Sequence, residues 1–372
     1  MKEFQVIPKI VMFDTVDELC TAYGIGAGDL LFYAGEFMAE RYFAGRIGEA
    51  LLIDCNRYGS GEPTDLMAES ICSAIGGYEY SRVFAVGGGT VLDLAKLFAL
   101  EKVSPVVDLF ERRLEAVKAK KLILVPTTCG TGSEMTNISI LELTAIHSKF
   151  GLADPALYAD EAVLVPELLE GLPFRFFAAS AIDALVHSVE SFTSPKAGSF
   201  SQMFSRQAMA MIIRGFKAIA EGGPEARRPY LKDFLIASNY AGIAFGNAGC
   251  AAVHALSYPL GAGYHVPHGE SNYCLFTAVY KKYLELDPDG GIMALNSYLA
   301  ELLGCSEDAV YDALDSLLGH LMEKKRMRDY GVREDELETY VTSVMTKQTR
   351  LMNNNYTKLD AEAVMEIYRS VY

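Results

Sequence analysis

The fold is decided by one stretch of sequence, Val83-Phe84-Ala85-Val86-Gly87-Gly88-Gly89-Thr90-Val91-Leu92-Asp93-Leu94-Ala95-Lys96. Its first four residues predict a buried strand and its last residues a helix, so the three glycines form the turn between them. Glycine lets the backbone approach a phosphate closely, and the free N–H groups at a helix start favour negative charge. The turn therefore suits the pyrophosphate of a dinucleotide, although it lacks the G-x-G-x-x-G pattern and such turns also occur without a ligand.

Apolar runs on both sides extend this pattern along the first half of the chain. Strands are predicted at Leu30–Ala34, Ala50–Asp54 and Leu122–Pro126, and a helix over Asp65–Ile75. Strands that alternate with helices predict a mostly parallel sheet. We therefore expect an α/β dinucleotide-binding domain over residues 1–166.

A second polar loop follows the predicted strand at Leu122–Pro126. It reads Pro126-Thr127-Thr128-Cys129-Gly130-Thr131-Gly132-Ser133-Glu134. Hydroxyl groups and glycines of this kind also form ordinary turns and caps. Ligands of open α/β sheets gather at the carboxyl ends of the strands, so the two loops together favour a nucleotide site. Cys129 is expected to be a packing residue rather than a nucleophile.

The second half of the chain has a different pattern, with long segments that are amphipathic or wholly apolar at helical period. These segments are Ala178–Phe192, Phe204–Ala220, Leu231–Ala244, Tyr273–Leu286, Ile292–Leu303, Glu307–Met322, Glu334–Met345 and Ala361–Tyr368. Residues 167–372 are therefore expected to form an all-α domain.

Histidines gather in this helical half together with one aspartate. Asp183 and His187 fall four residues apart, on one face of an apolar helix, while His254 lies in an apolar run and His268 opens another helix. Each has a plain alternative, as a hydrogen-bonded core residue or a surface ion pair. Yet four of the six histidines, His265 included, fall between residues 187 and 268. One carboxylate with three imidazoles suits Fe(II) or Zn(II) and leaves room for a substrate oxygen.

Charge and cysteine content limit the partners. The 33 Lys and Arg against 48 Asp and Glu give a net charge of −15, so no nucleic-acid partner is expected. Seven scattered cysteines without a C-x-x-C pair, and no long apolar stretch, predict a cytoplasmic protein without a membrane partner. The apolar segments Gln5–Ile7 and Ile10–Phe13 could pair with a second subunit or close as a hairpin on their own chain. We expect a homodimer or a higher homo-oligomer.

At these residues the sequence resembles the iron-containing (group III) alcohol dehydrogenases, over nearly its whole length. The motifs that carry the resemblance are Gly87–Thr90 with Asp93 and Lys96, Pro126–Glu134, Asp183–His187, His254-Ala-Leu-Ser-Tyr-Pro-Leu-Gly261 and Pro267-His268-Gly269. Within the family it resembles the 4-hydroxybutyrate dehydrogenases of anaerobic bacteria, through Gly59-Ser60-Gly61-Glu62-Pro63, Cys129–Asn137 and Asn239–Gly249. The resemblance implies the fold that this family shares with dehydroquinate synthase.

The resemblance also implies roles for particular residues. The metal ligands would be Asp183, His187, His254 and His268, and the cofactor contacts Gly87, Gly88, Gly89, Thr90, Asp93, Thr127, Thr128, Thr131 and Lys149. Many members carry an aspartate after an early strand that favours NAD over NADP. Ala34 or Gly35 aligns with it here, which weakens that preference, so NADP stays an alternative to the expected NAD. Tyr258 stands where many members have a histidine, so the relay role of that histidine does not carry over unchanged. The candidates for the proton relay are Tyr258, His265 and the cofactor ribose.

The activity implied is reversible hydride transfer between a primary alcohol and nicotinamide, with the metal polarising the substrate oxygen. The implied substrate pair is 4-hydroxybutyrate and succinic semialdehyde. No Arg or Lys occurs between residues 237 and 273. The partner of the substrate carboxylate therefore stays open among helix N-terminal amides, Asn247, His265, Arg175 and Lys281. The alternatives are a glycerol or simple-alcohol dehydrogenase of the same fold, a dehydroquinate synthase-like lyase that uses NAD transiently, and a non-catalytic binding protein.

Overall fold

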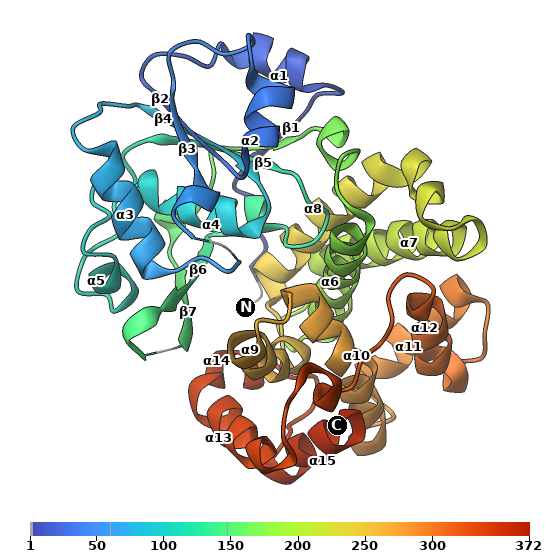
Figure 1. Cartoon of the computed structure of the whole chain (residues 1–372). Coiled ribbons are helices and arrows are strands. Elements are labelled where there is room, and N and C mark those ends of the chain that lie inside the picture. Colours follow the sequence, from blue (N-terminus) through green and yellow to red (C-terminus); the bar gives the residue numbers. More distant parts are fainter. Residues whose placement is uncertain (1–2, 60, 147) are drawn as a thin grey trace. The chain divides into compact units, whose positions relative to one another are not determined.

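The computed structural model describes residues 3–59, 61–146 and 148–372, and these form two compact units (Figure 1). The α/β unit is Val6–Leu172, and the helical unit is Pro173–Tyr372 together with the described residues before Val6. The division follows Leu172 rather than residue 166, where the sequence placed it. The 3-10 helix Pro166–Leu169 lies between these two points, and its Leu168 packs in the core of the α/β unit.

The α/β unit is built on a six-stranded sheet in the order β1-β8-β5-β4-β2-β3. Its strands are β1 (Lys9–Met12), β2 (Asp29–Tyr33), β3 (Leu51–Asp54), β4 (Arg82–Gly87), β5 (Lys121–Pro126) and β8 (Glu161–Leu164). Every pairing between them is parallel. The predicted parallel sheet and its four predicted strands are thus confirmed.

Helices cover both faces of this sheet. Alternate residues of β2, such as Leu30 and Phe32, pack in a core with α3 (Asp65–Ile75), α4 (Gly89–Phe98) and α5 (Val106–Phe110). The residues between them, such as Leu31 and Tyr33, pack on the opposite side with α1 (Val16–Tyr23). Strands buried on both faces explain the near-continuous apolar runs of the sequence. A further short helix, α2 (Glu36–Met38), follows β2.

Two features of this unit differ from the sequence-based picture. Ile10–Phe13 does not close as a hairpin, because β1 pairs in parallel with β8 of the same chain, about 150 residues later. An antiparallel hairpin, β6 (Ile138–Leu143) with β7 (Ser148–Ala153), follows the polar loop after β5 and was not predicted. Lys149 therefore lies on a hairpin strand.

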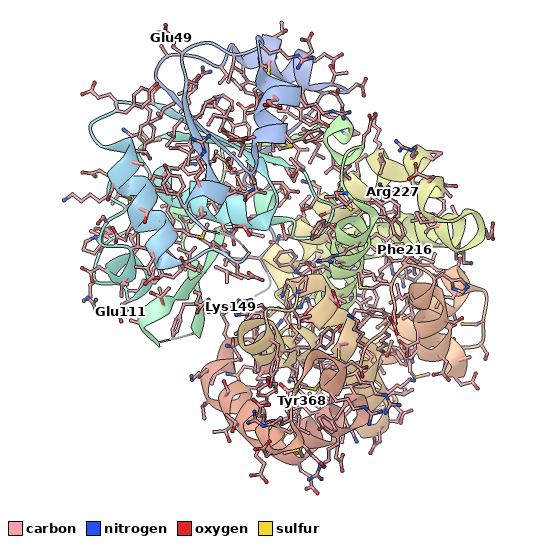
Figure 2. All side chains as sticks on the ribbon, viewed as in Figure 1. Glu49, Glu111, Lys149, Phe216, Arg227 and Tyr368 are labelled. Atoms are coloured by element: carbon pink, nitrogen blue, oxygen red, sulfur yellow. The ribbon has the colours of Figure 1, made fainter. Side chains whose placement is uncertain are left out.

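The helical unit confirms the eight predicted helices and adds two. Its helices are α6 (Phe174–Thr193), α7 (Ser199–Gly222), α8 (Leu231–Ala248), α9 (Ala252–Tyr264), α10 (His268–Leu286), α11 (Gly291–Leu303), α12 (Val310–Gly319), α13 (Leu337–Lys347), α14 (Thr349–Met352) and α15 (Ala361–Val371). The additions are α9 and α14. Large side chains such as Phe216 and Tyr368 fill its interior (Figure 2). None of the helices in the described part of the chain has the length and apolar character that crossing a bilayer requires.

Candidate functional site

The candidate metal centre is assembled in the helical unit, where α6 and α10 approach each other. Asp183 and His187 lie one turn apart on α6 and are buried, and His268 is the first residue of α10. Gly269 permits the approach, because a Cβ atom at this position would overlap the carbonyl oxygen of Ala179 in α6. Helix packing therefore accounts for the glycine of the Pro267-His268-Gly269 motif.

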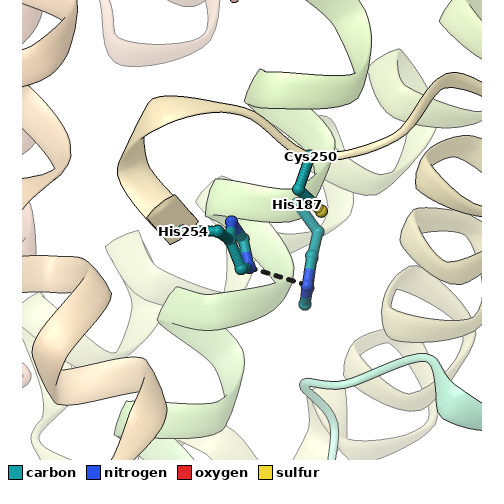
Figure 3. Close-up of side chains that lie close together, drawn as sticks. All are labelled: His187, Cys250 and His254. Carbon is teal, nitrogen blue, oxygen red and sulfur yellow. Dashed lines mark hydrogen bonds between the residues drawn. The ribbon is translucent and has the colours of Figure 1, made fainter. Parts of the chain in front are cut away.

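The donor atoms of the four predicted ligands converge. Asp183 Oδ1 lies 3.7 Å from both His254 Nε2 and His268 Nε2. His254 Nε2 lies 2.9 Å from His187 Nε2, as the dashed line in Figure 3 shows. Two ligands about 2.1 Å from one tetrahedral ion lie roughly 3.4 Å apart, so the spacing of Asp183, His254 and His268 fits a single divalent cation. His187 meets that group through His254.

The ligand atoms fall into two overlapping groups. One donor atom each of Asp183, His254 and His268 lies within 4.8 Å of the others. His187 forms a second such group with His254 and with Cys250, a residue that the sequence did not single out. His254 belongs to both groups, so it is the central member of the cluster.

Glu190 holds His254 through the ring nitrogen that faces away from the other candidate ligands. Its Oε2 atom lies 2.6 Å from His254 Nδ1 and also accepts the N–H of Ala251, and its Oε1 atom accepts the N–H of Val253. The carboxylate is fully buried. A carboxylate on the far nitrogen of a metal-binding imidazole fixes its tautomer and orientation, which leaves Nε2 directed at the other ligands.

Asn272 performs a similar task for Asp183. Its amide nitrogen lies 2.7 Å from Asp183 Oδ1 and 3.3 Å from Nε2 of both His254 and His268. Ser257 donates to the amide oxygen of Asn272 at 2.6 Å and so sets which end of the amide faces the cluster. The candidate ligands thus sit in a fully engaged polar network within an apolar unit.

The electrostatics of the cluster favour a carboxylate among cationic neighbours. Burial disfavours the charged form of Asp183, but His187, His268, His254 and the Asn272 amide together hold its pKa below the usual value. Burial also disfavours the imidazolium form of His254. The Cys250 thiol and Glu190 outweigh that effect and raise the pKa of His254 well above the usual value. A divalent cation would satisfy the same negative groups without a proton.

The candidate relay residues occupy different places. The Tyr258 ring centroid lies 6.1 Å from that of His268, so Tyr258 borders the cluster. His265 is exposed and takes a left-handed conformation, with φ of 52°, where α9 ends. It is in neither group of potential ligands among the described residues.

The proposed carboxylate partners have other contacts. The amide of Asn247 pairs with the backbone of Gln5 in both directions, and Lys281 forms an ion pair with Asp312. The guanidinium of Arg175 lies over the ring of Phe176. All three side chains are thus engaged in contacts of their own.

The candidate nucleotide site lies in the α/β unit at the carboxyl ends of β4 and β5. Gly87 pairs with Pro126 in the sheet, so the glycine-rich turn and the polar loop begin side by side. Strand order reverses at β2 and β4, which is where open α/β sheets bind ligands. The N–H of Thr127 also donates to the carbonyl of Gly87.

Two of the glycines let the loops come close to each other. A Cβ atom on Gly88 would lie 3.3 Å from the Thr128 methyl group, and one on Gly89 would lie 2.9 Å from that of Thr131. Gly87 serves a separate purpose, because its Cβ atom would overlap Val91 at the start of α4. The glycines are thus explained by the close packing of the two loops and of the first turn of α4.

Asp93 and Lys96 lie on α4, which follows the glycine-rich turn, and both bind Ser133 of the polar loop. Asp93 Oδ1 accepts hydrogen bonds from Ser133 Oγ at 2.5 Å and Lys96 Nζ at 3.2 Å, and its Oδ2 accepts the N–H of Ile140. Lys96 is fully buried and also contacts Ser133, Thr136 and the Ile138 carbonyl. Burial lowers the pKa of Lys96, whereas Asp93 opposes that effect.

The remaining predicted cofactor residues contact the segment 59–63. The Thr90 hydroxyl donates to the Gly61 carbonyl at 3.0 Å, and Lys149 Nζ lies 3.1 Å from Glu62. Ser60 lies outside the described residues. At the end of β2, the N–H of Gly35 donates to Asp54 on the neighbouring strand. Backbone groups therefore occupy the Asp54 side chain at this end of the sheet.

Sequence reasoning missed the residues that position the ligands, namely Glu190, Ser257 and Asn272, and it passed over Cys250. A signal for three of them is present in the spacing. Glu190 lies three residues after His187, Ser257 three after His254, and Asn272 four after His268. Residues three or four apart share a helix face, so the spacing places each of them on the face of its histidine. Asn272 contacts the imidazole of that same histidine. Glu190 instead binds the imidazole of His254, and Ser257 binds the amide of Asn272.

Comparisons with known proteins agree along the chain. Residues 10–166 match the family model for iron-containing alcohol dehydrogenase, and residues 177–372 match the C-terminal model of the same family. The 4-hydroxybutyrate dehydrogenase of Clostridium kluyveri is 45% identical over 372 residues, which is 100% of both chains. Long-chain-alcohol dehydrogenase 1 of Geobacillus thermodenitrificans is 34% identical over 79% of this chain and 75% of its own.

A solved structure shows the same fold. The sulfoacetaldehyde reductase of Bifidobacterium kashiwanohense, solved in complex with NAD+, superposes with a TM-score of 0.84 over 100% of this chain and 98% of that chain. Its sequence identity is 20%, so the likeness concerns the fold. Family models, a full-length relative and a solved structure thus agree in the architecture that they assign to the chain.

Proposed function

The chain belongs to the iron-containing alcohol dehydrogenase family, and on that basis we propose that it interconverts 4-hydroxybutyrate and succinic semialdehyde with a nicotinamide cofactor. The substrate assignment rests on the 45% identity to the Clostridium kluyveri enzyme, which extends over the whole of both chains. The metal cluster and the two nucleotide loops support the same reaction class.

In the proposed metal site, Asp183, His187, His254 and His268 hold one divalent cation. We propose Fe(II) in the cell, with Zn(II) as the competing ion, because the donor set of one oxygen and three nitrogens suits both. When bound, the cation would polarise the substrate oxygen and the nicotinamide would exchange hydride with the adjacent carbon. The chain's own residues supply the alignment and the electrostatics.

Positioning residues hold the ligands before substrate arrives. Glu190 keeps His254 directed at the cluster, and Asn272 keeps one Asp183 oxygen in place. Because both are buried, they need no rearrangement when the substrate binds. Tyr258, beside His268, is our candidate carrier for the hydroxyl proton, and His265 is the second candidate.

The proposed cofactor site uses the two loops of the α/β unit. The backbone of Gly87, Gly88 and Gly89, with the N-terminal end of α4, would hold the pyrophosphate. The hydroxyl-bearing residues Thr90, Thr127, Thr128 and Thr131, together with Lys149, would contact the rest of the cofactor. Asp93 would act mainly by holding the second loop in place, because its own oxygens bind Ser133, Lys96 and Ile140.

Two properties of the whole molecule complete the proposal. We propose a homo-oligomer, because β1 is an edge strand with Ile10 and Met12 exposed at 41% and 37%. We propose a cytoplasmic location, because none of the seven cysteines forms a disulfide. Light scattering on the purified protein tests the first, and fractionation of the source cells tests the second.

A rate comparison tests the substrate. Enzyme purified and assayed without oxygen, after elemental analysis of its metal, is given succinic semialdehyde, butyraldehyde or dihydroxyacetone with NADH and with NADPH. The proposal expects a higher kcat/KM for succinic semialdehyde than for the two uncharged substrates. Equal or lower values would defeat the substrate assignment, and product formation without net loss of NADH would indicate a lyase.

A further inference from the structure

Cys250 places a sulfur donor beside the metal cluster, and the ligand set proposed above does not use it. Its side chain is buried, and Figure 3 shows it next to His187 and His254. One donor atom of each of these three residues lies within 4.8 Å of the others. The thiol is therefore part of a cluster of three metal-binding side chains rather than an isolated cysteine.

The backbone that carries Cys250 is held firmly on both sides. The Asn354 amide donates to the carbonyl oxygens of Ala248 and of Cys250 itself, at 2.9 and 3.1 Å. On the following side, Glu190 accepts the N–H groups of Ala251 and Val253. The position of the thiol is thus built into the fold.

Gly249 makes this arrangement possible. It has φ of 79°, and a Cβ atom there would lie 2.8 Å from the Asn354 amide nitrogen. Another residue would be strained in that conformation and would push Asn354 away. The turn therefore brings the residue after Gly249 next to the histidines.

The two ligand groups differ in chemical softness. Asp183, His254 and His268 offer one oxygen and two nitrogens, which suit a ferrous ion. His187, Cys250 and His254 offer two nitrogens and one sulfur, and thiolate ligands favour zinc over harder ions. His254 occurs in both groups, and Glu190 already binds its Nδ1 atom, so only Nε2 is available to a metal ion. The two groups therefore cannot each bind an ion at the same time.

We propose that His187, Cys250 and His254 form a second, thiolate-containing zinc site that overlaps the ferrous site and competes with it. Zinc binding forms a Zn–S bond and releases the thiol proton to water, with no change of oxidation state. Zinc held there withdraws His187 and His254 from the catalytic arrangement and inhibits the enzyme. The inhibition rests on the proposed function, whereas the zinc site itself does not.

Cobalt(II) tests the site without any activity measurement. Metal-free protein is titrated with Co(II) in the absence of oxygen, and the near-ultraviolet spectrum is recorded. A thiolate ligand produces an intense sulfur-to-cobalt charge-transfer band, which oxygen and nitrogen ligands do not produce. We expect this band in the unmodified protein and in His268→Ala, which retains the whole second group.

Matched cysteine variants assign the band. Cys250→Ala should lose it, whereas Cys274→Ala should keep it, because Cys274 is equally a buried cysteine of the helical unit but lies in neither ligand group. Zinc affinity, measured against a chelator, should fall at least about tenfold in Cys250→Ala, since even loss of an outer partner of a ligand costs roughly 10- to 100-fold.

Several results would overturn the proposal. These are the absence of the band in the unmodified protein, its survival in Cys250→Ala, or equal zinc affinity in Cys250→Ala and Cys274→Ala. An enzyme that shows the band but does not reduce succinic semialdehyde would refute the proposed function and leave the zinc site standing. An active enzyme without the band would do the reverse.

Discussion

Replacement of Glu190 by glutamine should weaken metal binding while the protein still folds. Glu190 accepts three hydrogen bonds: Oε2 takes those of Ala251 N and His254 Nδ1, and Oε1 takes that of Val253 N. Glutamine retains the shape but has only one oxygen. If that oxygen takes the place of Oε2, two bonds survive, and the new NH2 group faces the N–H of Val253.

The magnitude follows from these contacts. One buried donor left without a partner costs about 1 to 3 kcal/mol of folding free energy. Metal affinity should fall by about 10- to 100-fold, or roughly 1.4 to 2.8 kcal/mol, because His254 loses its carboxylate partner. Glu190→Ala would strand all three donors at about 3 to 9 kcal/mol, comparable with the whole stability of many domains. Glutamine is therefore the informative substitution.

The assay measures affinity and stability separately. Metal-free Glu190→Gln competes with a chelator for zinc, and its unfolding is followed in denaturant with and without metal. Glu221→Gln on α7 is the control, because Glu221 is exposed. Wild-type zinc affinity in Glu190→Gln would refute the claim that this carboxylate positions His254, even if the variant were less stable.

Three further predictions concern the two sites. His268→Ala should abolish turnover and leave the circular dichroism spectrum unchanged; full activity with normal metal content would remove His268 from the ligands. Asp93→Asn should raise the Michaelis constant for the cofactor by about tenfold, since charged hydrogen bonds contribute roughly 1.5 to 3 kcal/mol and Asp93 positions Ser133. Asp17→Asn is the control, because Asp17 is exposed. An unchanged Michaelis constant in Asp93→Asn would contradict this role. Protein without metal should have an unfolding free energy about 2.7 kcal/mol lower than protein with free metal at 100 times its Kd. Denaturant titration measures this difference. Identical unfolding curves with and without metal would mean that the folded protein does not bind the metal.

The parts of the fold that could be predicted are those that local sequence determines. The helix predicted over Asp65–Ile75 coincides with α3, whose N-terminal Thr64 caps the N–H of Met67. Strands β2, β4 and β5 were recognised because burial on both faces makes them continuously apolar, and the edge strand β3 was recognised from its apolar run Leu51-Leu52-Ile53. The pairing of β1 with β8 was missed, since partners about 150 residues apart leave no local pattern that joins them.

The candidate site divides in the same way. Asp183 and His187 could be paired from their spacing alone, because one helix carries both. The approach of His268 to Asp183 depends on the contact of α10 with α6 at Gly269, which no periodicity reveals. The family resemblance predicted the ligand set, whereas the place of Cys250 beside His187 and His254 became visible only in three dimensions.

The sequence predicted neither helix α9 nor the role of Glu190, and the two omissions have one cause. Its sequence contains Pro259 and two glycines, and Ala251 at its N-cap provides no side-chain hydrogen bond, so the usual helix signals are weak. The N–H groups of Ala251 and Val253, which a local cap would normally satisfy, are instead satisfied by Glu190 from α6. The same buried carboxylate contacts Nδ1 of His254, so it begins the helix and orients the ligand that the helix carries. A negative charge at a helix N-terminus is also favoured by the helix dipole. The start of α9 and the position of His254 therefore depend on a residue more than sixty positions earlier, and sequence patterns within α9 could not predict either.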